Sequence, residues 1–85
     1  MEYKMIIVNY IMTKTIFSKD HKILVERLKK AREDAGMNQL DVAKMLKKSQ
    51  SYISKIESGQ RRVDVIQLKN LASIYKKDIN FFIKE

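Results

Sequence analysis

The sequence predicts an all-α domain of about five helices. Three observations indicate this class: proline is absent, glycine occurs only at Gly36 and Gly59, and apolar residues recur at helical spacing beyond residue 19. The chain has 85 residues, of which 45% are hydrophobic and 33% are charged. This composition is typical of one globular domain and excludes collagen-like, loop-dominated and disordered chains.

The first predicted helix begins near Asp20 and ends at Gly36, a residue type that readily adopts the left-handed conformation found after many helices. Its inner face follows an i, i+4, i+7, i+11 pattern. The residues of this pattern are Leu24, Leu28, Ala31 and Ala35.

Two short helices follow, separated by a tight turn. Asn38 and Asp41 form a capping-box pattern at the start of the first. Ser49 is a good N-cap for the second, residues 50–58, and Gly59 closes it. The apolar residues expected to face inward are Leu40, Ala43, Leu46, Ile53 and Ile56.

Asp64 and Asp78 are N-cap candidates for the last two helices. The inner face of the fourth helix is expected to hold Val65, Leu68, Leu71, Ala72 and Tyr75. The fifth helix is short and extends through Phe82, which closes the core together with Ile79. In this arrangement Phe81 and Ile83 point towards solvent or a partner chain.

Residues 1–18 form a separate N-terminal extension, and residues 19–85 form the helical domain. The apolar stretch from Met5 to Met12 is much shorter than the ~20 residues of a membrane span. It also lacks the positive lead-in and cleavage site of a signal peptide. Three interpretations stay open: a leader upstream of an alternative start, a short β-strand that pairs with another chain in a dimer, or a segment that packs on the core.

The charge pattern indicates an anionic partner. Eighteen Lys and Arg residues against ten Asp and Glu give a net charge of +8. Residues 39–62 carry the densest positive charge, from Lys44, Lys47, Lys48, Lys55, Arg61 and Arg62 against Asp41 and Glu57. A basic domain is typical of nucleic-acid binding, although attraction to an acidic membrane surface or simple solubility would also account for the charge.

The segment from Gln39 to Gly59 resembles the helix-turn-helix of phage repressors, Cro proteins and their xenobiotic-response-element relatives. The matching positions are Gln39, Val42-Ala43, Leu46, Ser49, Ile53-Ser54 and Glu57-Ser58-Gly59. The resemblance extends from about Ile23 to Phe82 and implies a five-helix, lambda-repressor-like DNA-binding domain. Lys47 departs from the pattern, because the family usually has glycine there, and a left-handed backbone would cost a lysine ~1 kcal/mol.

The resemblance implies a sequence-specific transcriptional regulator, namely a homodimeric repressor that reads a palindromic operator in double-stranded DNA. It also implies a cytoplasmic protein of prokaryotic, phage or plasmid origin. The alternative is an antitoxin-type or other protein-interaction module that also binds DNA. Cysteine is absent and histidine occurs once, so we expect no enzyme activity, no metal site and no cofactor. No membrane association or small-molecule ligand is expected either.

The outer face of the third helix is the expected reading surface. At about 100° per residue, Ser51, Ser54 and Lys55 point away from the inward isoleucines, and Gln50 lies at the flank. Glutamine can hydrogen-bond adenine through two atoms. The full set of expected DNA contacts is Gln39, Lys47, Lys48, Ser49, Gln50, Ser51, Tyr52, Ser54, Lys55, Arg61 and Arg62.

Several of these residues have a second interpretation. Ser49 is expected to act mainly as a helix cap and secondarily as a DNA contact. Tyr52 either packs on the turn or contacts the sugar-phosphate backbone. The contacts of Gln39, Arg61 and Arg62 with phosphate are implied by the resemblance. The resemblance also implies a structural ion pair between Arg32 and Glu57.

Overall fold

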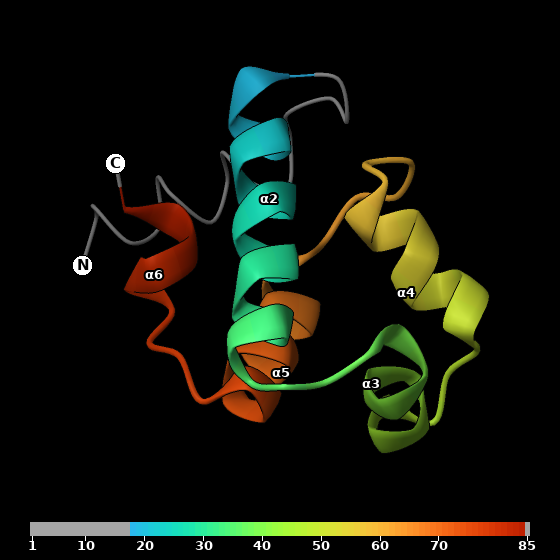
Figure 1. Ribbon diagram of the computed structural model, residues 1–85. Helices are drawn as coiled ribbons and strands as arrows, with labels where there is room; N and C mark the ends of the chain where they lie inside the picture. Colours follow the sequence, from blue (N-terminus) through green and yellow to red (C-terminus); the bar gives the residue numbers. More distant parts are fainter. Residues whose placement is uncertain (1–17, 85) are drawn as a thin grey trace.

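The computed structural model describes residues 18–84, which form five helices and no strand. The helices are α2 (Lys19–Asp34), α3 (Gln39–Leu46), α4 (Gln50–Glu57), α5 (Val65–Tyr75) and α6 (Asn80–Ile83). The long helix α2 is the central element, with α6 on one side and α3 and α4 on the other (Figure 1). The all-α prediction is confirmed, whereas the short N-terminal strand, one of the three open interpretations, falls outside the described residues.

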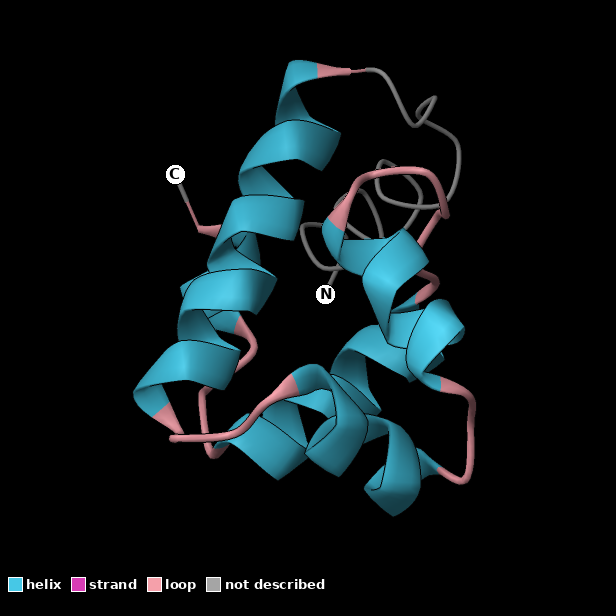
Figure 2. Cartoon of the chain, turned by 45° about the vertical axis from the view of Figure 1, so that its right-hand side comes forward, coloured by secondary structure: helices cyan, strands magenta, loops and turns pink. Residues whose placement is uncertain are grey.

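Short loops join the five helices (Figure 2), and polar side chains cap the starts of four of them. The cap residues are Ser18, Asn38, Ser49 and Asp64, and each side chain accepts a hydrogen bond from the backbone N–H three positions later. The predicted caps at Asn38, Ser49 and Asp64 are confirmed. Each such cap stabilises its helix by about 1 kcal/mol.

Helix α6 begins differently from the prediction. Ile79, and not Asp78, occupies the N-cap position, and it makes no side-chain capping bond. The Asp78 carboxylate accepts a hydrogen bond from the Asn80 N–H at 2.8 Å, while the Asp78 carbonyl accepts from Phe81 N–H at 2.9 Å. The first turn is therefore tighter than an α-helical turn, which moves the helix start two positions past Asp78.

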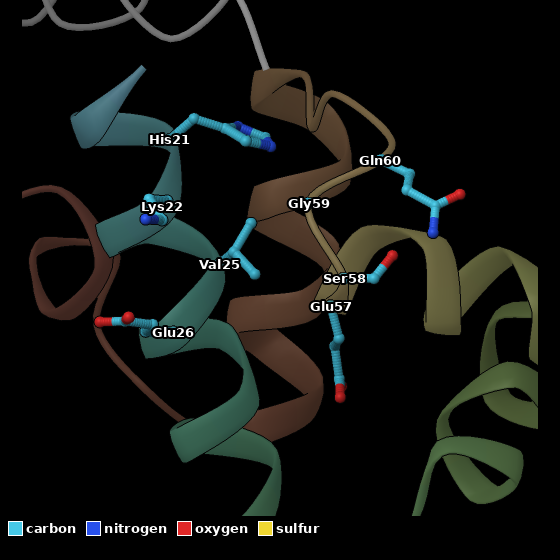
Figure 3. Close-up of a pocket in the computed structure, with 8 residues that line it drawn as sticks. All are labelled: His21, Lys22, Val25, Glu26, Glu57, Ser58, Gly59 and Gln60. Carbon is cyan, nitrogen blue, oxygen red and sulfur yellow. The ribbon is translucent and has the colours of Figure 1, made fainter. Parts of the chain in front are cut away.

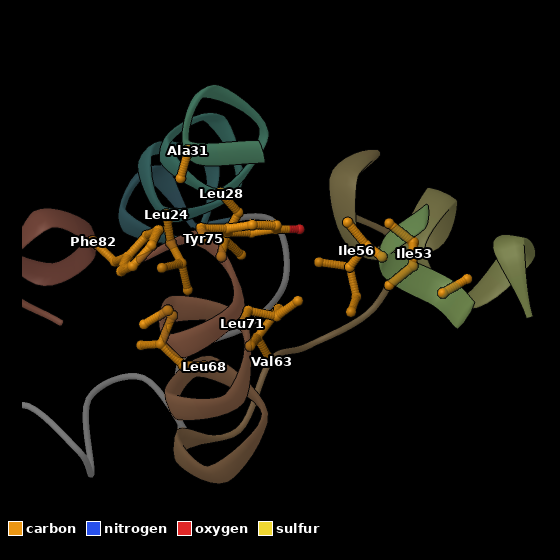
Figure 4. Close-up of a cluster of buried hydrophobic side chains, with 13 residues drawn as sticks. Leu24, Leu28, Ala31, Ile53, Ile56, Val63, Leu68, Leu71, Tyr75 and Phe82 are labelled. Carbon is orange, nitrogen blue, oxygen red and sulfur yellow. The ribbon is translucent and has the colours of Figure 1, made fainter. Parts of the chain in front are cut away.

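The core lies between α2, α4 and α5 and is closed by Phe82 of α6 (Figure 4). Leu28, Ile53 and Leu68 are at most 1% exposed. The other buried members are Leu24, Ala31, Val42, Ala43, Ile56, Val63, Leu71, Ala72, Tyr75 and Phe82. Most of the predicted inward positions are therefore buried.

Three predicted core positions are wrong. Ala35 is exposed because it lies past the last turn of α2, as the C-cap. Val65 is only half-buried because it is the first residue of α5. Leu40 is 45% exposed, and Val42 is buried in its place. At about 100° per residue, Leu40 lies roughly 110° from the middle of the buried stripe of α3, so it faces solvent.

Phe81 and Ile83 also differ from the prediction, because both are half-buried against the core of their own chain. The Phe81 ring packs edge-on against Phe82, with ring centroids 5.1 Å apart and planes at 83°. The Lys77 ammonium lies 4.7 Å from the Phe81 centroid and covers it further. Intrachain packing therefore occupies much of the apolar surface that the sequence assigned to solvent or a partner.

Two helices end at a lysine in the left-handed conformation. Lys47 has φ 57° and ψ 44°, and Lys76 has φ 56° and ψ 44°. The next residue in each case, Lys48 or Lys77, donates its N–H to a carbonyl five positions earlier, at 2.9 and 3.0 Å. This is the usual hydrogen-bond pattern of a left-handed helix end, so the turn at Lys47 has a left-handed backbone although glycine is absent there.

Candidate nucleic-acid interface

Helix α4 has one buried face and one exposed polar face. Ile53 and Ile56 are each 1% exposed and anchor the helix to the core. The predicted reading residues are all exposed, namely Ser51, Ser54 and Lys55 on the opposite face and Gln50 at its flank. An α-helix with its side chains is about 10–12 Å in diameter, and the major groove of B-DNA is about 12 Å wide. The exposed face of α4 therefore has the size and chemistry of a groove-reading surface.

The orientation of α4 is held by an ion pair with α2. Arg32 Nε donates to Glu57 Oε2 at 2.7 Å, and Arg32 Nη2 donates to Glu57 Oε1 at 3.0 Å. The two side chains are 12% and 5% exposed. Hydrogen bonding to Glu57 raises the pKa of Arg32, which favours the charged guanidinium. A third bond, from Arg32 Nη1 to the Met37 carbonyl at 2.8 Å, attaches the loop before α3.

Gln39 belongs to this same network. Its Nε2 donates to Glu57 Oε1 at 3.1 Å, so the side chain joins the start of α3 to the end of α4. The helical wheel of α3 contains a signal of this arrangement, because Gln39 lies on the same stripe as Val42, Ala43 and Leu46. The amide nitrogen that the resemblance assigned to phosphate is thus directed towards Glu57.

Tyr52 brings together two of the predicted cationic contacts. Lys48 Nζ lies 5.3 Å from the Tyr52 ring centroid, and the Arg61 guanidinium carbon lies 4.6 Å from it. The Tyr52 hydroxyl accepts a hydrogen bond from Gln67 Nε2 at 2.7 Å. In the free protein Tyr52 packs beside the turn, and its contact with the sugar-phosphate backbone stays a prediction.

Gln67 was not among the residues predicted from the sequence, although a signal for it exists. Asp64 and Gln67 stand three positions apart, and they form a full capping box at the start of α5. The Asp64 N–H donates to Gln67 Oε1 at 2.9 Å, which leaves the amide nitrogen to reach Tyr52. A search for capping pairs would have picked out Gln67, but not its contact with Tyr52.

Positive charge surrounds the start of α4. The exposed basic residues are Lys44, Lys47, Lys48, Lys55, Arg61 and Arg62. The partial positive charge of the α4 N-terminus adds to them, since Ser49 satisfies only one of its free N–H groups. Glu57 does not offset this field, because Arg32 neutralises it. The surface beside the reading face is therefore suited to polyanions.

A groove of about 670 Å³ lies between the first half of α2 and the segment after α4 (Figure 3). His21 of α2 reaches towards Gly59 across it, and the backbone N–H of His21 is bound by the Ser18 cap. Burial lowers the pKa of His21, the charge of Arg62 lowers it further, and the Gly59 backbone acts in the opposite direction. His21 therefore stays neutral at pH 7 and packs beside the loop that follows α4.

Within residues 18–84, no cluster of three or more His, Asp or Glu side chains is placed to hold a metal ion. None of the helices in that range combines the length and the apolar character needed to cross a membrane. The exposed basic surface of α3 and α4 and the loop after α4 is therefore the main candidate site in the described part of the chain.

Comparison with known proteins identifies one family. Residues 28–82 match the family described as Helix-turn-helix. The matched range contains the Arg32–Glu57 pair, the whole of α3, α4 and α5, and α6 as far as Phe82. No curated protein and no solved structure is significantly similar to the chain.

Proposed function

Because the chain belongs to the Cro/C1-type helix-turn-helix family of DNA-binding transcriptional regulators, we propose that it is a sequence-specific repressor that binds a palindromic operator as a homodimer. The observation that supports this most directly is the division of α4 into an anchored apolar face and an exposed polar face. Such a helix can enter the major groove without disturbing the core.

Sequence recognition is assigned to the exposed face of α4. Gln50, the first residue of the helix, would place its amide against a base edge, where glutamine prefers adenine. Ser51, Ser54 and Lys55 lie on the same exposed face and would contact neighbouring bases or phosphates. Ser49 caps the helix, and the protein backbone at this residue would lie close to the sugar-phosphate backbone of the DNA.

Phosphate contacts are assigned to the residues on either side of α4. Lys47 and Lys48 precede the helix, and Arg61 and Arg62 follow it. Gln39 and Tyr52 support this surface through their hydrogen bonds to Glu57 and Gln67. Contacts of this kind hold the protein in register on the duplex and are independent of base sequence.

The proposed homodimer is supported by the way in which such helices read DNA. One α4 helix covers a single half-site, whereas two helices related by a two-fold axis cover half-sites one helical turn, ~34–36 Å, apart. Sedimentation of the full chain with and without operator DNA tests this point. A 1:1 complex with a symmetric operator at saturating protein would contradict the dimer, even if the DNA is bound.

The function is tested by selecting bound duplexes from a random pool and titrating the enriched sequence at several salt concentrations. Each neutralised phosphate contributes a slope of about −0.9 in log K against log salt. We expect an enriched palindrome and a slope of several units. Failure to enrich any duplex, or a flat salt dependence, would overturn the proposed function.

A further inference from the structure

We propose that Tyr52 is a positioning residue that holds Lys48 and Arg61 together as one two-cation group for the DNA backbone. The inference rests on the proposed function and adds a specific role to it. Tyr52 lies within α4, but its hydroxyl is directed to α5 and its ring receives two cations. Its task would be to organise phosphate contacts and not to read a base.

The two cations come from different segments of the chain. Lys48 lies in the turn before α4, and Arg61 lies in the loop after it. Both residues are exposed, yet both charged groups lie within 5.3 Å of the same ring centroid, a distance typical of cation–π contacts. The two charges are consequently no more than about 10 Å apart.

Hydrogen bonds hold both the side chain and the backbone of Tyr52. Gln67 Nε2 donates to the Tyr52 hydroxyl at 2.7 Å, and Gln67 itself is held by the Asp64 N–H at 2.9 Å. The Tyr52 N–H donates to Ser49 Oγ at 3.2 Å, as part of the α4 cap. Tyr52 is thereby positioned by α4 and α5 in the free protein.

The grouping of like charges indicates an anionic ligand. Lys48 and Arg61 repel one another, and the N-terminus of α4 adds positive charge beside them. The negative face of the ring offsets part of this repulsion, and a phosphate would offset more. Because the two cationic groups lie at most about 10 Å apart, they are close enough to contact neighbouring phosphates of one DNA strand. Holding both long side chains beforehand also reduces the conformational freedom that they lose on binding.

The proposal is tested with the variants Tyr52→Leu and Tyr52→Phe. Their affinities for operator and random DNA are measured at several salt concentrations. Leucine leaves the net charge unchanged but removes the ring. We expect it to lower the salt slope by up to about two units per protomer, because two phosphate contacts of about 0.9 each are lost. Affinity for operator and random DNA should fall by the same factor. Phenylalanine keeps the ring and should restore most of the slope.

A second measurement avoids changes at Tyr52. Lys48→Gln, Arg61→Gln and the double variant alter exposed side chains only. If the two cations act as one group, the loss in log Kd for the double variant is clearly smaller than the sum of the single losses. Lys44→Gln combined with Arg61→Gln is the matched control, and its losses should add.

The outcomes separate this proposal from the function on which it rests. Two results together would overturn the two-cation group alone. The steep salt slope of the wild type would persist in Tyr52→Leu, and the affinity losses of Lys48→Gln and Arg61→Gln would add. An affinity loss limited to the operator would make Tyr52 a base contact instead. If the wild type binds no duplex at all, both proposals fail.

Discussion

The Arg32 guanidinium and the Glu57 carboxylate form two hydrogen bonds of 2.7 and 3.0 Å, although the residues lie 25 positions apart. Glu57 is the last residue of α4, and Arg32 lies in the last turn of α2. Gln39 and the Met37 carbonyl complete the network. The end of the proposed reading helix is thus tied to the longest helix of the domain.

Arg32→Ala is expected to destabilise the fold by about 3–5 kcal/mol, because it leaves the Glu57 charge buried and unpaired. Chemical unfolding monitored by circular dichroism measures the change. Lys30→Ala is the matched control, since Lys30 pairs with Asp34 on the surface of the same helix and is 67% exposed. That pair should contribute no more than about 1 kcal/mol. Equal effects of the two substitutions would contradict a buried role for Arg32.

Lys47→Gly and Lys76→Gly should each stabilise the domain by ~0.5–1 kcal/mol. Glycine removes the steric cost of the left-handed backbone, roughly 1–2 kcal/mol, and loses part of this gain through the greater entropy of the unfolded chain. The two sites share nearly the same φ and ψ, so unfolding experiments should find similar gains. Only Lys47→Gly should weaken DNA binding, because Lys76 lies at the end of α5. A loss of stability at either site would refute the strain argument.

Gln50→Ala and Arg61→Ala should differ in sequence dependence. Loss of a two-atom base contact at Gln50 is expected to cost ~1–3 kcal/mol on the selected operator and little on random DNA. Loss of a phosphate contact at Arg61 should weaken both duplexes alike and reduce the salt slope. Titrations of both variants with both duplexes measure the difference. Equal weakening of both duplexes by Gln50→Ala would exclude base reading by that side chain.

The free energy of unfolding should fall at high pH because of Tyr75. Burial raises its pKa to about 12, and the charge of Glu57 acts in the same direction, partly offset by Arg32. The unfolded chain releases this proton near pH 10, whereas the folded chain retains it to about pH 12, so stability is lost between these values. The loss should reach about 2 kcal/mol by pH 12. Tyr75→Phe should reduce the pH dependence by this amount in unfolding experiments at pH 9 to 12.

His21 should have the opposite pH profile, with stability lost on acidification. Its pKa is lowered by burial and by Arg62, so the unfolded chain takes up the proton first as pH falls below about 6.5. His21 is the only histidine of the sequence, so its ring proton gives one resolvable NMR titration. We expect a midpoint below that of a model peptide, and His21→Gln should remove the matching loss of stability. A midpoint at or above the peptide value would contradict burial of the ring.

Local features were predictable because they depend on residues three or four positions apart. Asn38 and Asp41 cap α3, and Ser49 caps α4, as their spacing indicates. The break between two apolar faces predicted the position of the turn at Lys47, whereas its left-handed backbone is a finding of the structure. Leu40 and Ala35 were wrongly assigned to the core. An apolar side chain does not by itself indicate which face of its helix packs against the other helices.

The sequence by itself determined the class of the domain, the caps that set most helix starts, and the polar face of α4, since periodicity and capping act within a few residues. Only the tertiary structure decided the partners of the polar side chains. Gln39 turns to Glu57, and Tyr52 gathers Lys48, Arg61 and Gln67, because these contacts depend on how α3, α4 and α5 are placed around one another. That placement results from the packing of the whole core. The distances between helices depend on residues far apart in the sequence and not on neighbouring residues.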